Sequence, residues 1–193
     1  MKRNLNNISD QLRIKRCSKL LFMLILTGLM PLFNYAQVTL NSTASATIVT
    51  TIAMTKNYDL DFGNLAVTTV AGTCVLAPVA GNNPTRNVTG GVTLPAFHGT
   101  PRAAEFITTG VPTTVFTINI PAAILTITSG ANTMTVDTYT TDQTVVTAGT
   151  SWTGTLGSSG TTFHVGGTVH VAANQAAGLY TNAVGFPVTV NYQ

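Results

Sequence analysis

Three histidines are the side chains best suited to acid–base or metal chemistry: His98, His164 and His170. His164 and His170 stand six residues apart in a run that alternates like a strand, so at ~3.3 Å per residue they lie about 20 Å apart. Ligands that share one metal ion each lie about 2 Å from it. The spacing therefore predicts solvated surface histidines and no metal site.

Two acids form the next candidate, because Asp59 and Asp61 are two residues apart and paired carboxylates can hydrolyse glycosidic bonds. They alternate with Leu60 and Phe62 and precede a Gly-Asn dipeptide, which is a turn signal. A calcium site would need several more oxygen donors than this segment supplies. We therefore expect solvated acids beside a turn.

Cys74 is the remaining candidate nucleophile, since the other cysteine, Cys17, lies in a segment with the pattern of a cleaved leader. No neighbouring histidine or base would lower its pKa, so we expect a small buried hydrophobic residue. No Ser lies in a G-x-S-x-G motif, and the Gly-rich residues 154–160 carry no Lys. We expect no catalytic residue, no cofactor and no enzyme.

Two aromatic residues could instead bind a ligand. Trp152 and Tyr139 could form a platform for a sugar or a protein, because an aromatic ring is apolar and carries a polar tip. Aromatic residues also commonly pack at the edge of a core. Both interpretations stay open at this point.

The last sixteen residues, 178–193, alternate between apolar and polar side chains, which predicts a strand with one buried face. Pro187 has no backbone N–H to donate, so we expect this strand at a sheet edge. A further strand can add to such an edge. The apolar positions are Val184, Phe186, Val188, Val190 and Tyr192.

A second alternation spans residues 38–54, about 56 Å at ~3.3 Å per residue and far longer than the common strand of ~5–6 residues. Either one strand changes sheets midway, or its first part is an arm that reaches beyond the domain and adds to a neighbouring copy. The side chains expected in that contact are Val38, Leu40 and Ala44 of the arm and Val188, Val190 and Tyr192 of the C-terminal strand.

Residues 1–36 have the pattern of a secretory signal peptide. Six bases against the single acid Asp10 precede an almost wholly apolar run at residues 20–33, and the small residue Ala36 follows. The run is shorter than the ~20 residues that a membrane-spanning helix needs. We expect cleavage after Ala36, no membrane span in the mature chain, and export to the periplasm, the cell surface or the extracellular space.

Removal of this leader changes the net charge from +3 to −2, because three bases and five acids remain. Without a basic patch, we expect no nucleic-acid partner and no anionic membrane surface as a partner. The remaining charged residues are Lys56, Arg86, Arg102, Asp59, Asp61, Glu105, Asp137 and Asp142.

The mature 157 residues suit one domain with a sizeable core. They contain one Lys, one Glu and many Thr and Val residues, a composition that favours strands over helices. Short runs separated by turn residues predict a single antiparallel β-sandwich over residues 37–193, with a kink or bulge at Gly166-Gly167. The runs are residues 58–62, 115–120, 125–127, 134–136 and 163–171.

An ordered set of motifs runs through the mature chain. They are Ala44-x-Ala46-x-Ile48, Leu60-Asp61-Phe62-Gly63, Gly72 with Val75 and Pro78, Ala104-x-Phe106-x-x-Thr109-Gly110, Phe163-His164-Val165-Gly166-Gly167-Thr168, Gly178-x-Tyr180, and Phe186-x-Val188-Thr189-Val190-Asn191-Tyr192. This order resembles the secreted family catalogued as domain of unknown function 4402. The resemblance implies an exported sandwich and no particular activity.

The C-terminal end also resembles, more distantly, subunits of chaperone–usher pili and spore-coat-U-like proteins. Those are incomplete immunoglobulin-like, Greek-key sandwiches, completed by an N-terminal strand of the next subunit. Many end in an alternating strand with a penultimate Tyr and an upstream Gly, matched here by Tyr192 and, a little further upstream, Gly178. This chain lacks the disulfide that many of them carry. The resemblance implies self-association by strand addition, or capture by a periplasmic chaperone.

Two hypotheses of function come first. The leading one is a non-enzymatic exported sandwich that acts as a structural, pilin-like subunit of a surface assembly. The alternative is an adhesin-like module that binds carbohydrate or protein through Trp152 or Tyr139. A hydrolase has the least support, because the sequence contains no recognisable catalytic constellation.

Overall fold

The computed structural model describes residues 37–193. The signal peptide predicted for residues 1–36 lies outside the described residues. The described chain falls into two units, since residues 37–46 belong to an N-terminal unit and Thr47–Gln193 forms a compact one. Within residues 37–193, no helix is long and apolar enough to cross a membrane.

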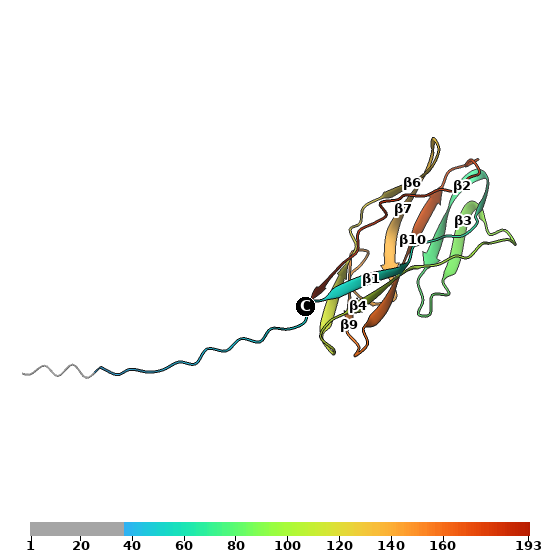
Figure 1. The fold of residues 1–193 in the computed structure, drawn as a ribbon. Coiled ribbons are helices and arrows are strands. Elements are labelled where there is room, and N and C mark those ends of the chain that lie inside the picture. The colour runs from blue at the N-terminus through green and yellow to red at the C-terminus, as the bar shows by residue number, and fades with distance from the viewer. Residues whose placement is uncertain (1–36) are drawn as a thin grey trace, which may run out of the picture. The chain divides into compact units, whose positions relative to one another are not determined.

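The compact unit is all-β, and its strands form two antiparallel sheets, as the composition predicts (Figure 1). The larger sheet contains β1 (Ala53–Tyr58), β2 (Ala66–Ala77), β3 (Thr85–Thr93), β4 (Ala104–Thr109), β6 (Leu125–Ser129), β7 (Asn132–Thr141) and β10 (Thr161–Val171). The smaller sheet has the order β11 (Thr189–Tyr192), β5 (Val115–Asn119), β9 (Ser151–Thr155) and β8 (Thr144–Thr147).

Strand β10 organises the larger sheet, and Figure 1 shows it between β7 and β2. Its first half pairs with β4 and its second half with β2, while β7 lies along its other side. The bulge predicted at Gly166-Gly167 is instead on β7. Between the pairs Gly166–Thr140 and Thr168–Asp137, β10 advances two residues and β7 advances three, and Thr138 of β7 has a φ of 50°. A Cβ atom on Gly166 would overlap the carbonyl oxygen of Leu76, so this close approach of two backbones requires glycine.

The core gathers the apolar faces of strands from both sheets. Phe163 of β10 stacks on Phe106 of β4 with ring centroids 5.3 Å apart, and it also meets Phe116 of β5 at 6.4 Å. Cys74 is fully buried, which confirms the prediction of a small hydrophobic residue. Burial raises the pKa of its thiol, although the charge of Arg86 opposes the rise.

Several of the predicted runs are strands, but the run at residues 58–62 is an exception. The run at 58–62 is not a strand, because β1 ends at Tyr58. Asp61 Oδ1 accepts a hydrogen bond from the backbone N–H of Gly63 at 2.7 Å, and Gly63 has a φ of 66°. This side-chain turn diverts the backbone from the ladder.

The C-terminal strand is shorter than the alternation predicts, since β11 begins at Thr189. Asn182 Oδ1 accepts hydrogen bonds from the backbone N–H groups of Val184 and Gly185, and Gly185 has a φ of 69°. Val184 is consequently 94% exposed, so its predicted place on the buried face is wrong.

The N-terminal alternation is also not one long strand. Strand β1 begins at Ala53, and residues 37–52 are in no strand. The interpretation as a single strand that changes sheets is therefore wrong. The other interpretation, an arm before the domain, agrees with the assignment of residues 37–46 to a separate unit.

Candidate assembly site

The arm is a strand-forming sequence without a strand partner in the described chain. Every residue from 37 to 51 is exposed, including Val38 at 86%, Leu40 at 90% and Ile48 at 99%. Ala44 is exposed with them. A sequence of alternating apolar and Thr residues normally buries one face in a sheet. The sequence of this segment therefore favours pairing with another strand, and no strand among the described residues pairs with it.

Strand β11 offers an edge. It lies at the end of the smaller sheet and, among the described residues, pairs with β5 alone, from Thr189 opposite Asn119 to Tyr192 opposite Phe116. The edge position predicted from Pro187 is thus confirmed. Val188 and Val190 are half-buried and pack against the core, while Thr189 is exposed. Among the strands of residues 37–193, none pairs with the outer side of β11, so an added strand could pair there.

Tyr192 ties the end of β11 to the start of the domain. Its hydroxyl accepts a hydrogen bond from the backbone N–H of Val111 at 2.8 Å and donates one to the carbonyl oxygen of Thr50 at 2.9 Å. A Cβ atom on Gly110 would overlap this hydroxyl, so glycine is required beneath it. The hydroxyl therefore holds the segment just before β1 beside the end of β11, a link that no sequence pattern reveals.

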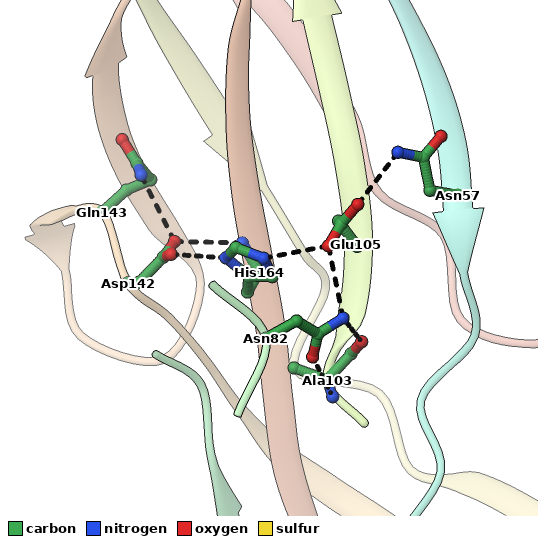
Figure 2. A network of polar contacts seen from close by, with 7 residues as sticks. All are labelled: Asn57, Asn82, Ala103, Glu105, Asp142, Gln143 and His164. Carbon is green, nitrogen blue, oxygen red and sulfur yellow. Dashed lines mark hydrogen bonds and ion pairs between the residues drawn. The ribbon is translucent and has the colours of Figure 1, made fainter. Parts of the chain in front are cut away.

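The structure overturns the prediction for His164. It is 4% exposed, and both ring nitrogens meet carboxylates: Nδ1 lies 2.7 Å from Asp142 Oδ2, and Nε2 lies 3.2 Å from Glu105 Oε2 (Figure 2). The Asp142 Oδ1 atom also accepts the backbone N–H of His164 at 3.0 Å. His164 lies on the face of β10 opposite to Phe163 and Val165, and it is buried because Asp142 and Glu105 lie against its ring.

Glu105 extends this network to two further segments, as Figure 2 shows. Asn57 of β1 donates to Glu105 Oε1 at 2.9 Å, and Asn82 donates to Oε2 at 3.3 Å. The hydrogen bond from Asn57 lowers the pKa of Glu105, and bonds from His164 and Asn82 add to this against the opposing effect of burial. Strands β1, β4 and β10 are thus joined by a closed polar network whose groups bond to one another.

The other two histidines are exposed, as predicted. His98 Nδ1 lies 3.0 Å from the carbonyl oxygen of Gly99, and His170 Nε2 lies 2.9 Å from Asp137 Oδ1. Asp59 is an exposed acid that pairs with Lys56. Within residues 37–193, no three His, Cys, Asp or Glu side chains are grouped so that they could hold a metal ion.

Of the two interpretations of Trp152 and Tyr139, packing in the core is confirmed and a ligand platform is wrong. Trp152 and Tyr139 are each 1% exposed, and the Tyr139 ring stacks on Phe186 with centroids 4.4 Å apart. A ring in this position belongs to the core and cannot receive a sugar. Burial, with a smaller effect of the Asp137 charge, raises the pKa of Tyr139 to about 12. Its hydroxyl has no hydrogen-bond partner among the described residues.

Comparison with known proteins bears on the compact unit. A family model described as "Domain of unknown function (DUF4402)" matches residues 52–192, which is nearly all of Thr47–Gln193 and none of the arm at residues 37–51. No curated protein matches the chain, and no solved structure matches it.

Proposed function

The chain belongs to the family described as domain of unknown function (DUF4402), and from that premise we propose that it is a non-enzymatic, exported structural subunit that assembles by strand addition. The arm of one copy adds to the β11 edge of the next. The observation that carries the proposal is the exposed arm, whose alternating sequence lacks a strand partner while β11 keeps a free edge.

The dimensions of donor and acceptor fit. An extended arm over residues 37–51 spans about 50 Å at ~3.3 Å per residue, whereas the four residues of β11 need about 13 Å. The arm can therefore cover β11 and continue along the half-buried Val188 and Phe186 that precede it. Main-chain hydrogen bonds would supply affinity, and Val38 and Leu40 would supply apolar contact.

The root of the arm favours a partner in another copy. Residues 46–51 read Ala-Thr-Ile-Val-Thr-Thr and contain no Gly, Pro, Asn or Asp, the residues that reverse a chain. The β-branched side chains here favour extended backbone. Since Tyr192 already holds the Thr50 carbonyl beside the end of β11, the arm would need a sharp reversal to pair with its own β11.

The energy balance requires a long contact. Burial of Val38 and Leu40 contributes about 1.5–3 kcal/mol each. Ordering each arm residue costs about 1–2 kcal/mol, so two side chains alone do not offset an ordered arm. Backbone pairing along most of the arm is therefore part of the proposal. This requirement is met if the arm completes the immunoglobulin-like sandwich of the next copy, as in pilins, and if a periplasmic chaperone covers β11 until the arm binds.

Paired variants of the arm test the proposal. We expect the exported wild-type chain to form concentration-dependent oligomers in size-exclusion chromatography with light scattering. Val38→Asp with Leu40→Asp should abolish them, because both charges enter the apolar contact. The matched control, Thr39→Asp with Asn41→Asp, adds the same charge on the other face of the arm and should retain assembly.

Two results would overturn assembly by the arm. One is equal loss of oligomers in both variants, which would indicate a charge effect. The other is a cross-link within one chain: an Asn41→Cys, Asn191→Cys variant, with both side chains on the exposed face, that forms its disulfide inside monomers would show that the arm pairs with its own β11. Disulfides between chains, found by mass spectrometry after mixing isotope-labelled and unlabelled copies, are the expected result.

A further inference from the structure

One row of side chains crosses five strands on the outer face of the larger sheet. The pairing registers bring one residue of each strand into line. These are Thr89 on β3, Thr73 on β2, His170 on β10, Thr135 on β7 and Thr126 on β6. Their chain neighbours lie in the core or pack against it, so the row itself faces outwards. We refer to these five residues as the threonine row. At ~4.8 Å between strands it is about 19 Å long.

A depression of about 500 Å³ lies along the middle of the threonine row. Its lining includes Thr73, Thr133, Thr135 and His170, together with the small apolar residues Gly72 and Ala172. Because strand backbones set these positions, the site exists before any ligand binds, as is usual for small-molecule sites.

The depression has a single carboxylate beside it and no cation in its lining. His170 Nε2 lies 2.9 Å from Asp137 Oδ1, and the Thr138 hydroxyl donates to the same oxygen at 2.9 Å. Among the described residues, neither Asp137 Oδ2 nor His170 Nδ1 has a hydrogen-bond partner in the structure. Both side chains are partly exposed, at 27% and 45%.

We propose that the threonine row binds a neutral oligosaccharide. Threonine hydroxyls both donate and accept hydrogen bonds, as sugar hydroxyls do, and Asp137 adds a strong acceptor. The small apolar residues can contact the C–H faces of a sugar ring. A phosphate, sulfate or carboxylate would meet Asp137 without a compensating Lys or Arg, which disfavours an anionic ligand. The length of the row suits an oligomer more than a single sugar.

This inference does not depend on strand addition, because the threonine row lies on the larger sheet and β11 belongs to the smaller one. It also gives the carbohydrate alternative a location that the sequence did not predict. Trp152 and Tyr139 are buried, whereas the threonine row is open to solvent along its length.

The test is a titration of the full exported chain, ¹⁵N-labelled, with defined probes. The neutral probes are cellohexaose, maltohexaose and chitohexaose, and the anionic probe is a heparin hexasaccharide. We expect at least one neutral probe to shift backbone amide signals at the threonine row. Thr135→Val, which removes one hydroxyl without changing shape, should raise the Kd about three- to tenfold.

Matched variants decide the outcome. Asp137→Asn should weaken binding at least as much as Thr135→Val, and His170→Gln serves as the second row variant. Thr153→Val, a half-exposed threonine on β9 of the smaller sheet, should leave the Kd unchanged. The proposal is overturned if no neutral probe shifts the row at millimolar concentration, if only the heparin probe binds, or if the row variants bind as the wild type does.

Discussion

At the scale of single residues, Tyr192 has the clearest structural role. Its hydroxyl bonds to backbone groups of Val111 and Thr50, which lie far apart in the sequence. Removing the hydroxyl would leave a backbone donor and a backbone acceptor without their partners. Such losses cost more than an average hydrogen bond contributes, because each group keeps its desolvation penalty.

We expect Tyr192→Phe to lower the free energy of unfolding by about 1–3 kcal/mol in urea denaturation. Hydrogen exchange at the start of the domain, around Thr50, should accelerate as well. The control is Tyr58→Phe, because Tyr58 is 42% exposed and its ring would still lie against Arg102. That variant should change stability by less than about 0.5 kcal/mol; equal effects of the two substitutions would contradict the assigned role.

Glu105 acts at the same scale through its charge. Its pKa lies below the ordinary value of 4.5, chiefly because Asn57 donates a hydrogen bond to it. A carboxyl group whose folded-state pKa is lowered stabilises the fold at pH values above the unfolded-state pKa. That contribution is lost as the pH falls through the folded-state pKa. The buried network thus favours the fold at neutral pH.

Glu105→Gln should therefore flatten the loss of stability in acid. The measurement is the urea midpoint of wild type and variant, followed from neutral pH to well below pH 4.5. We expect the difference between the two proteins to be largest at neutral pH and to shrink as the pH falls. A difference that stays constant over this range would show that Glu105 acts through shape alone.

At the scale of elements, β10 holds the larger sheet together, because three other strands pair along its length. Gly166 allows the backbone of β2 to approach closely, whereas the register shift against β7 comes from an extra residue on β7, where Thr138 has a φ of 50°. Residues 163–169 are all buried because both faces of β10 are covered: Phe163, Val165 and Val169 lie in the core, and the carboxylates of Asp142 and Glu105 lie against His164 on the other face. A strand with one open face would have placed every second side chain in solvent.

Gly166→Ala should be strongly destabilising, since the new Cβ would overlap the Leu76 carbonyl and the side chain of Pro78. We expect a loss of about 1–3 kcal/mol in unfolding free energy, or failure to accumulate as folded protein. Thr162→Ala, at an exposed position of the same strand, is the control and should stay within about 0.5 kcal/mol of wild type. Similar stability of both variants would show that β2 and β10 can separate without cost.

At the scale of the whole molecule, the chain combines a core of apolar side chains with very few charges. Only eight Lys, Arg, Asp and Glu residues occur in residues 37–193. Such a surface of hydroxyls and amides relies on hydrogen bonds and apolar contact for recognition, since long-range charge attraction is weak. Both the arm contact and the threonine row are of this kind.

Deletion of residues 37–44 should separate folding from assembly. Because these residues are exposed and in no strand, we expect the thermal midpoint of the compact unit to stay within about 2 °C, as for a change near 0.5 kcal/mol. Oligomers should disappear from size-exclusion profiles of the same samples. A large drop in the midpoint would mean that the arm stabilises its own domain, contrary to the proposed exchange.

Much of the architecture follows from local sequence. The abundance of Thr and Val, with Gly and Pro between short runs, specified an all-β chain because these preferences act within a few residues. The same reasoning located the edge strand from Pro187, but it expected on β10 a bulge that lies on β7. It failed where a side chain bonds to its own backbone, as at Asp61 and Asn182, since such turns compete with a continuing alternation.

Which side chains meet was decided by the tertiary structure alone. Two sheets had to pack before Trp152 and Tyr139 became core residues, and β4 had to join β10 before His164 met Glu105. The threonine row likewise depends on the registers of four strand pairs. By itself the sequence determined strand-forming segments, because alternation is local, and it left the arm as one of two interpretations. Partners and exposed faces depend on register, which long-range contacts set.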